Sequence, residues 1–135
     1  MPTNDKQVMV KTPLDAVLQF RAVLPKEQKE ERVFVLPLDA HGKVLAKPIL
    51  VSVGSEDGTA VIDAGAIFRE ALKGGAVSIV LVHNHPSGDP EPSEDDVALT
   101  EQVQEGAKLL DLCLMDHLII GDQTYYSFKE RGLIQ

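Results

Sequence analysis

Apolar residues recur along this chain of 135 residues at the three- and four-residue spacing that is typical of helices. The stretch Thr12-Pro13-Leu14-Asp15 supplies an N-cap, a proline for the first helical position and a capping-box acid. We therefore predict a helix from residue 13 to about residue 24, which Pro25 ends. Two more helices are predicted, after Asp63 and after Ser93, because each is an N-cap residue type that precedes a periodic apolar run.

The ends and buried faces of these two helices follow from the same pattern. Gly74-Gly75 ends the first, and the second should run to about residue 110. Apolar spacing in the longer helix predicts which of its side chains face the core. They are Val97, Val103, Ala107 and Leu110.

Shorter apolar runs, rich in β-branched residues, lie between the helices and predict strands. The predicted strands are residues 32–38, 43–53, 76–82, 112–120 and 124–128. The turn Asp39-Ala40-His41-Gly42 joins the first two into a hairpin, and Pro48 marks the second as an edge strand or a bulge. Strands with interleaved helices predict an α/β fold, in which helices cover both faces of a mixed sheet.

Length and composition favour one soluble domain. We expect residues 1–11 to be loosely ordered, with a short strand around Val8-Met9-Val10, and residues 12–135 to form a domain that buries ~68% of its unfolded surface. Cys113 is the single cysteine, so no intrachain disulfide forms and a reducing compartment is expected. Without an apolar run of 18 residues or a signal peptide, the expected location is the cytoplasm, with no membrane contact.

Charge narrows the range of functions. The formal net charge of −8 argues against a broad nucleic-acid footprint, which needs clustered lysine and arginine. Acidic residues gather in one short segment, and the resulting field attracts cations and repels phosphates. These acids are Asp89, Glu91, Glu94, Asp95 and Asp96.

Two histidines follow the predicted strand 76–82, and their spacing favours a metal site. His83 and His85 stand at i and i+2 and so point to one side of an extended chain. A loop with three prolines leads to Asp96, which should lie on the first turn of the helix capped by Ser93 and face the loop. Two imidazoles and one carboxylate without a fourth protein ligand predict an open zinc site, with one Zn²⁺ per chain and a place for water.

These residues also allow other interpretations. The pair Ser93 and Asp96 also fits a capping box, which would employ the same carboxylate. His117 lies in an apolar strand and is predicted to be a hydrogen-bonded core histidine rather than a fourth ligand. A zinc deaminase is disfavoured, because it needs a pair of cysteines in a Pro-Cys-x-x-Cys motif.

A zinc hydrolase also needs a base. The metal lowers the pKa of its water from about 15.7 to ~7, and a nearby carboxylate takes the proton. Among the acids, Glu30 and Glu31 are slightly favoured because they stand at the entrance of a core strand. The full set of candidates is Glu27, Glu30, Glu31, Glu56 and Glu70.

The segment His83-Asn84-His85-Pro86, with Ser93 eight and Asp96 eleven positions after the second histidine, resembles the JAMM (MPN-plus) metalloprotease motif. Together with residues 116–121 and 127–132, the wider segment 83–90 resembles the RadC family. The resemblance makes residues 12–135 a single RadC-like JAMM/MPN domain. Full-length RadC proteins carry an additional N-terminal helix-hairpin-helix region, so we expect the short, stand-alone form.

The resemblance implies a three-layer α/β/α fold of the JAB/MPN, cytidine-deaminase-like kind, with His83, His85 and Asp96 as zinc ligands. It also implies that Ser93 donates a hydrogen bond to the developing oxyanion. Aligning the family pattern on Leu38-Asp39 puts its glutamate at Glu31, which would be the general base.

The expected function is therefore zinc-dependent hydrolysis of an amide or isopeptide bond in a peptide or protein. Two alternatives stay open. RadC-like proteins are customarily labelled DNA repair proteins, so the chain could be a repair, recombination or mobile-element accessory protein whose metal serves structure or binding. A metal-dependent nuclease is the other, since zinc hydroxide also attacks phosphorus. The charge does not support direct nucleic-acid binding, although the family allows it, and no sequence feature specifies the substrate or an oligomeric state.

Overall fold

The structure, a computed structural model, describes residues 8–25, 29–54 and 63–134. These residues form three helices and five strands. In chain order they are α1 Pro13–Arg21, β1 Arg32–Leu38, β2 Ile49–Val53, α2 Ala64–Lys73, β3 Ser78–Asn84, α3 Glu94–Leu109, β4 Cys113–Ile120 and β5 Tyr125–Ser127. The loose ordering expected for residues 1–7 lies outside the described residues.

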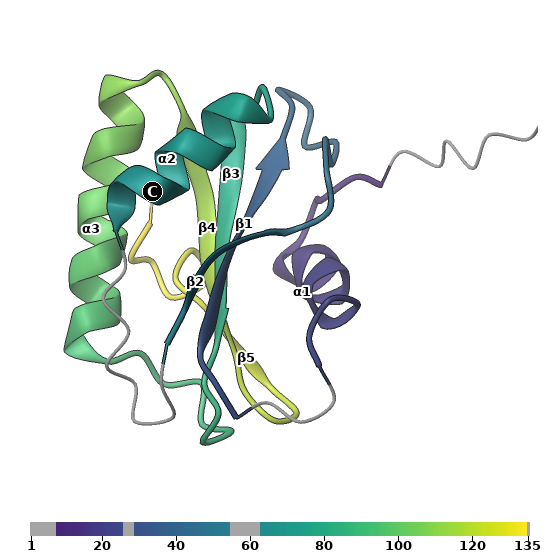
Figure 1. Cartoon of the computed structure of the whole chain (residues 1–135), viewed down its shortest axis with the longest axis vertical. Coiled ribbons are helices and arrows are strands. Elements are labelled where there is room, and N and C mark those ends of the chain that lie inside the picture. The colour runs from purple at the N-terminus through teal and green to yellow at the C-terminus, as the bar shows by residue number, and fades with distance from the viewer. Residues whose placement is uncertain (1–7, 26–28, 55–62, 135) are drawn as a thin grey trace, which may run out of the picture.

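The five strands form one mixed sheet in the order β2-β1-β3-β4-β5. Only the central pair, β3 and β4, runs parallel, and the other three pairs are antiparallel. Helices α2 and α3 cover one face of the sheet and α1 covers the other (Figure 1). The predicted α/β architecture with three layers is therefore confirmed.

Strand β3 is buried along its whole length and divides the core in two. Ile79 and Leu81 pack with residues of α2 and α3, whereas Val80 and Val82 pack with residues of α1. This alternation is the two-residue period of a strand with helices on both faces. Continuing it past Leu81 turns His83 toward the side of α2 and α3.

The predicted helix caps are present. Thr12 and Asp15 form a capping box on α1, and Ser93 and Asp96 form one on α3. Asp63 accepts the Gly65 N–H at the start of α2, which Gly74 caps at its other end. Among the described residues, no helix combines the length and apolar character that a membrane crossing requires.

Several predicted boundaries were wrong. Helix α1 ends at Arg21, three residues before the predicted end, because the chain enters a turn in which the Val23 N–H donates to Phe20. The predicted strand 43–53 is a true strand only after Pro48, and Val44 contributes just an isolated bridge to Leu38. As predicted, this strand β2 is an edge of the sheet and pairs with β1 through a bulge.

Two expectations about buried residues also needed correction. Leu110 is 44% exposed, because it is the C-cap of α3 and lies beyond the last helical turn that packs on the sheet. Val97 is only partly buried. At the N-terminal end, Val10 is 5% exposed and its N–H donates to Gly42.

Candidate metal centre

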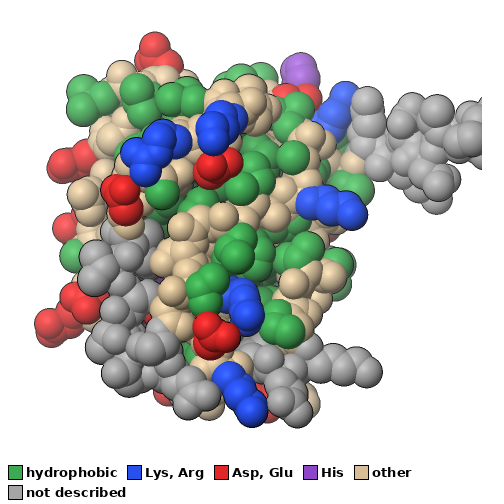
Figure 2. Space-filling model, in the orientation of Figure 1, with side chains coloured by type: hydrophobic (Ala, Val, Ile, Leu, Met, Phe, Trp, Pro, Cys, Tyr) green, Lys and Arg blue, Asp and Glu red, His purple; other side chains and the backbone are tan. Residues whose placement is uncertain are grey.

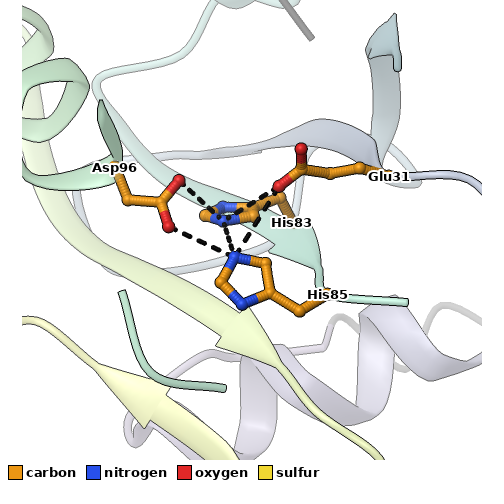
Figure 3. Close-up of side chains that lie close together, drawn as sticks. All are labelled: Glu31, His83, His85 and Asp96. Atoms are coloured by element: carbon orange, nitrogen blue, oxygen red, sulfur yellow. Dashed lines mark hydrogen bonds and ion pairs between the residues drawn. The ribbon is translucent and has the colours of Figure 1, made fainter. Parts of the chain in front are cut away.

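Four side chains from three parts of the chain converge where β1 begins and β3 ends, on the side of α2 and α3 (Figure 3). Glu31 immediately precedes β1, and His83 is the penultimate residue of the antiparallel neighbour β3. His85 follows β3 by one residue, and Asp96 lies in the first turn of α3. One ligand atom from each of the four lies within 4.8 Å of the others.

The donor atoms of His83, His85 and Asp96 form a compact triangle. The two Nε2 atoms are 3.1 Å apart, and each lies 3.2 Å from an oxygen of Asp96. In a tetrahedral zinc site with bonds of about 2.0–2.1 Å, neighbouring ligand atoms are roughly 3.3 Å apart. The spacing and chemistry of the three donors therefore fit a zinc-sized divalent ion.

Glu31 lies slightly farther away. Its Oε1 is 3.5 Å from His83 Nε2 and 3.7 Å from His85 Nε2. The residue is 7% exposed, and burial raises the pKa of its carboxyl group, with the negative charge of Asp96 adding to the effect. A partly desolvated carboxylate beside the three donors holds a proton more readily than an exposed one.

The other proposed bases that the structure describes are not in this cluster. Glu30 is exposed and makes an ion pair with Arg32, and Glu70 pairs with Lys73 on α2. Glu27 and Glu56 lie outside the described residues.

The carboxylate of Asp96 takes part in both the capping box and the cluster. Its Oδ2 accepts the Ser93 N–H at 2.8 Å, while the two imidazoles lie 3.2 Å from its two oxygens. Burial alone would raise the pKa of Asp96, but the neighbouring imidazoles of His83 and His85 outweigh it and hold that pKa far below its usual range. The capping box and a ligand role are therefore compatible in this geometry.

Each histidine is oriented through its second nitrogen. His85 Nδ1 lies 2.9 Å from the carbonyl oxygen of Asp89, and His83 Nδ1 lies 2.8 Å from His117 Nε2. Burial would lower the pKa of His85, but the contacts with Asp96 and the Asp89 carbonyl raise it overall. His117 is fully buried outside the cluster, which confirms its prediction as a hydrogen-bonded core histidine.

Ser93 lies at the edge of the site. Its Oγ accepts the Asp96 N–H at 3.1 Å, and the residue is exposed. The cap occupies a lone pair of the oxygen, so the hydroxyl hydrogen can still be donated to a bound group.

Asn84, which lies between the two histidines, was not singled out from the sequence. Its side-chain oxygen accepts the Arg32 N–H at 2.8 Å, and its amide nitrogen donates to the Glu30 carbonyl at 3.1 Å. These two bonds fix the backbone of Arg32 and Glu30, the neighbours of Glu31 in the chain. The Gly54 N–H also donates to the Glu31 carbonyl at 2.7 Å. A buried polar residue at the end of an otherwise apolar strand is the sequence signal that could have indicated this role.

Asn84→Ala is expected to lower the rate of any hydrolysis at this site by about 10²-fold, the effect of a misplacement on the order of 1 Å. The variant should keep one metal ion per chain, because Asn84 lies outside the cluster of potential ligands. Steady-state kinetics and metal analysis on the same sample check both points. Loss of the metal with an unchanged rate per bound ion would contradict this role.

Comparisons with known proteins agree with the fold and the cluster. The family model of the RadC-like JAB domain matches residues 10–133. A UPF0758 protein of Methanosarcina mazei is 41% identical over 110 residues, which are 82% of this chain and 47% of that protein. A UPF0758 protein of Roseiflexus sp. is 38% identical over 130 residues, 96% of this chain and 54% of that protein.

The chain thus spans about half the length of the curated relatives that it matches. The matched segment includes every residue of the four-residue cluster. From the family match and these relatives we conclude that the chain belongs to the RadC-like JAB domain family.

Proposed function

We propose that this chain is a zinc-dependent hydrolase that cleaves an amide or isopeptide bond in a peptide or protein. One observation carries the proposal. His83, His85 and Asp96 form a metal-sized triangle, and Glu31, a buried carboxylate from elsewhere in the chain, faces it. Three protein ligands with a neighbouring base are the composition of a catalytic zinc site rather than a closed structural one.

In this proposal His83, His85 and Asp96 hold the metal. When bound, zinc supplies acidification of a water molecule and polarisation of the substrate carbonyl. Glu31 takes a proton from the attacking water and returns it to the departing amine, so that one group acts first as base and then as acid. Ser93 donates its hydroxyl hydrogen to the negative oxygen that develops on the substrate.

The position of Glu31 supports a base over a fourth ligand. Its distances of 3.5 and 3.7 Å to the histidine nitrogens exceed those among the three proposed ligands. Its raised pKa also brings proton exchange closer to neutral pH, which suits acid–base catalysis.

The charge around the site favours a peptide over a nucleic acid as substrate. Acidic side chains appear along the α3 side of the molecule (Figure 2), and four of them are exposed on that helix. They are Glu94, Asp95, Glu101 and Glu105. The first two adjoin Asp96, where their charge would repel a phosphate backbone.

A library of peptides and isopeptide-linked substrates tests the proposal. We expect the zinc-loaded chain to cleave at least one class, a chelator to stop cleavage, and added zinc to restore it. A library left intact by the zinc-loaded chain, or cleavage that persists in chelator, would count against a zinc hydrolase. A parallel DNA-binding titration at several salt concentrations tests the accessory-protein alternative, which tight, salt-dependent binding would favour.

A further inference from the structure

A row of buried polar side chains leads from the candidate metal site into the core. His83 Nδ1 lies 2.8 Å from His117 Nε2, and His117 Nδ1 is hydrogen-bonded to Thr100 Oγ1. None of the three residues is more than 2% exposed. Because bulk water does not reach them, their N–H and O–H groups must be donated to neighbouring protein atoms. The direction of donation therefore decides which nitrogen of His83 carries a hydrogen.

The contacts of Thr100 indicate that direction. Its hydroxyl lies 2.8 Å from the backbone carbonyl of Asp96, one helical turn earlier, to which it can only donate. A hydroxyl has one hydrogen, so with this bond made Thr100 Oγ1 accepts from His117 Nδ1. His117 Nε2 then keeps its lone pair and accepts the hydrogen of His83 Nδ1. The Nε2 of His83 is left without a hydrogen, and this is the atom that faces the other potential ligands.

The opposite direction would disable the site. If Thr100 donated to His117, then His117 would donate through Nε2 to His83 Nδ1. The hydrogen of neutral His83 would then stand on Nε2, and a nitrogen that carries a hydrogen cannot bind a metal. It would also leave the 2.8 Å contact between Thr100 Oγ1 and the Asp96 carbonyl without a hydrogen.

The ring of His117 is also held in position. It stacks on Phe128 with 4.7 Å between ring centroids and an angle of 7° between the planes. Phe128 is fully buried. Stacking keeps the nitrogens of this ring aligned with both hydrogen-bond partners. Groups that hydrogen-bond to a metal ligand and so orient it are expected to be held in this way.

We propose that Thr100 and His117 are positioning residues that favour the tautomer of His83 with its hydrogen on Nδ1, which leaves the Nε2 lone pair free for a metal. The inference rests on the proposed function in one respect, namely that His83 is a metal ligand. In the proposal Thr100 also connects two of the proposed ligands. Its hydroxyl donates to the backbone of Asp96 and accepts from His117, which orients His83.

Thr100→Val tests this directly, with Thr100→Ser as its matched control. Valine preserves the shape but cannot accept from His117, whereas serine keeps the hydroxyl. Nitrogen-15 NMR of the metal-free chain, at mildly alkaline pH where imidazoles are neutral, reports the tautomer of His83. We expect a larger share of the Nδ1–H form in the wild type and Thr100→Ser than in Thr100→Val, in which the tautomer shifts toward Nε2–H. Zinc titration should show binding weakened about 10–100-fold in Thr100→Val alone.

A second pair of variants keeps the test decisive if Thr100→Val does not fold. In His117→Gln the side-chain oxygen can accept from His83 Nδ1, whereas His117→Leu offers no acceptor. We expect the Gln variant to bind zinc more tightly than the Leu variant. Wild-type tautomer and affinity in Thr100→Val, or equal affinities in the two His117 variants, would overturn the proposal.

These measurements separate the inference from the proposed function. If the variants show the expected order of zinc affinities but the chain cleaves no substrate, the positioning role is supported and only the hydrolase is refuted. If the chain shows zinc-dependent cleavage but Thr100→Val keeps the wild-type zinc affinity and tautomer, the hydrolase is supported and the positioning role is refuted.

Discussion

Replacing Glu31 with Gln is expected to lower the rate of amide or isopeptide hydrolysis about 10²–10⁴-fold, the usual contribution of a general base. Glutamine preserves the size of the side chain but cannot take a proton from water. The zinc content should stay at one ion per chain, because the three proposed ligands His83, His85 and Asp96 are untouched. Single-turnover kinetics on a substrate from the library, together with metal analysis, measures both quantities.

Glu30→Gln is the matched control for this variant. It removes the neighbouring carboxylate, which is exposed and paired with Arg32 instead of facing the cluster. Its rate should stay close to that of the wild type. A larger loss in Glu30→Gln than in Glu31→Gln would reassign the base, and loss of zinc from Glu31→Gln would make Glu31 a ligand.

His85→Ala is expected to abolish stoichiometric zinc binding. If three protein ligands share about 10–16 kcal/mol, one ligand accounts for roughly 3–5 kcal/mol, or about 10²–10⁴-fold in affinity, enough for a competing chelator to strip the ion. His85 is only partly buried, so its removal should leave the sheet and the core intact. Competition of the purified chain against a zinc chelator, followed by metal analysis, gives the affinity and the stoichiometry.

His41→Ala controls for the loss of an imidazole in general. His41 is exposed in the turn after β1 and lies outside the cluster, so this variant should bind one zinc ion as the wild type does. Retention of stoichiometric zinc by His85→Ala would refute the ligand assignment. Equal losses in both variants would point to non-specific binding.

Local chemistry made much of the fold predictable. Strand β1 has the predicted bounds because its run of apolar residues is buried almost throughout and ends at a turn signal. The boundary of β3 was misplaced, since the prediction ended it at Val82 and the structure extends it to Asn84. The extension depends on pairing with β1 and β4, where His83 lies opposite Val33 and Asn84 opposite Ile120. Such contacts join distant segments and leave no local signal.

Local signals likewise predicted the proposed metal ligands better than the residues that surround them. Spacing alone indicated that His83, His85 and Asp96 could converge, because strand and helix periods place side chains on known faces. Glu31 emerged from local reasoning only as one of several acids, and the family resemblance selected it. The role of His117 depends on the parallel register of β3 and β4, in which it lies opposite Leu81. Thr100 could have been noticed, since it lies four residues after Asp96 on the same helical face.

Anomalous diffraction from zinc-soaked crystals, recorded at the zinc absorption edge, tests the metal site most directly. The account predicts one strong peak per chain, at about 2.0–2.2 Å from His83 Nε2, His85 Nε2 and an oxygen of Asp96. The carboxylate of Glu31 should lie beyond bonding distance of that peak. A peak elsewhere, or one bonded through Nδ1 of His83 or directly to Glu31, would contradict the account.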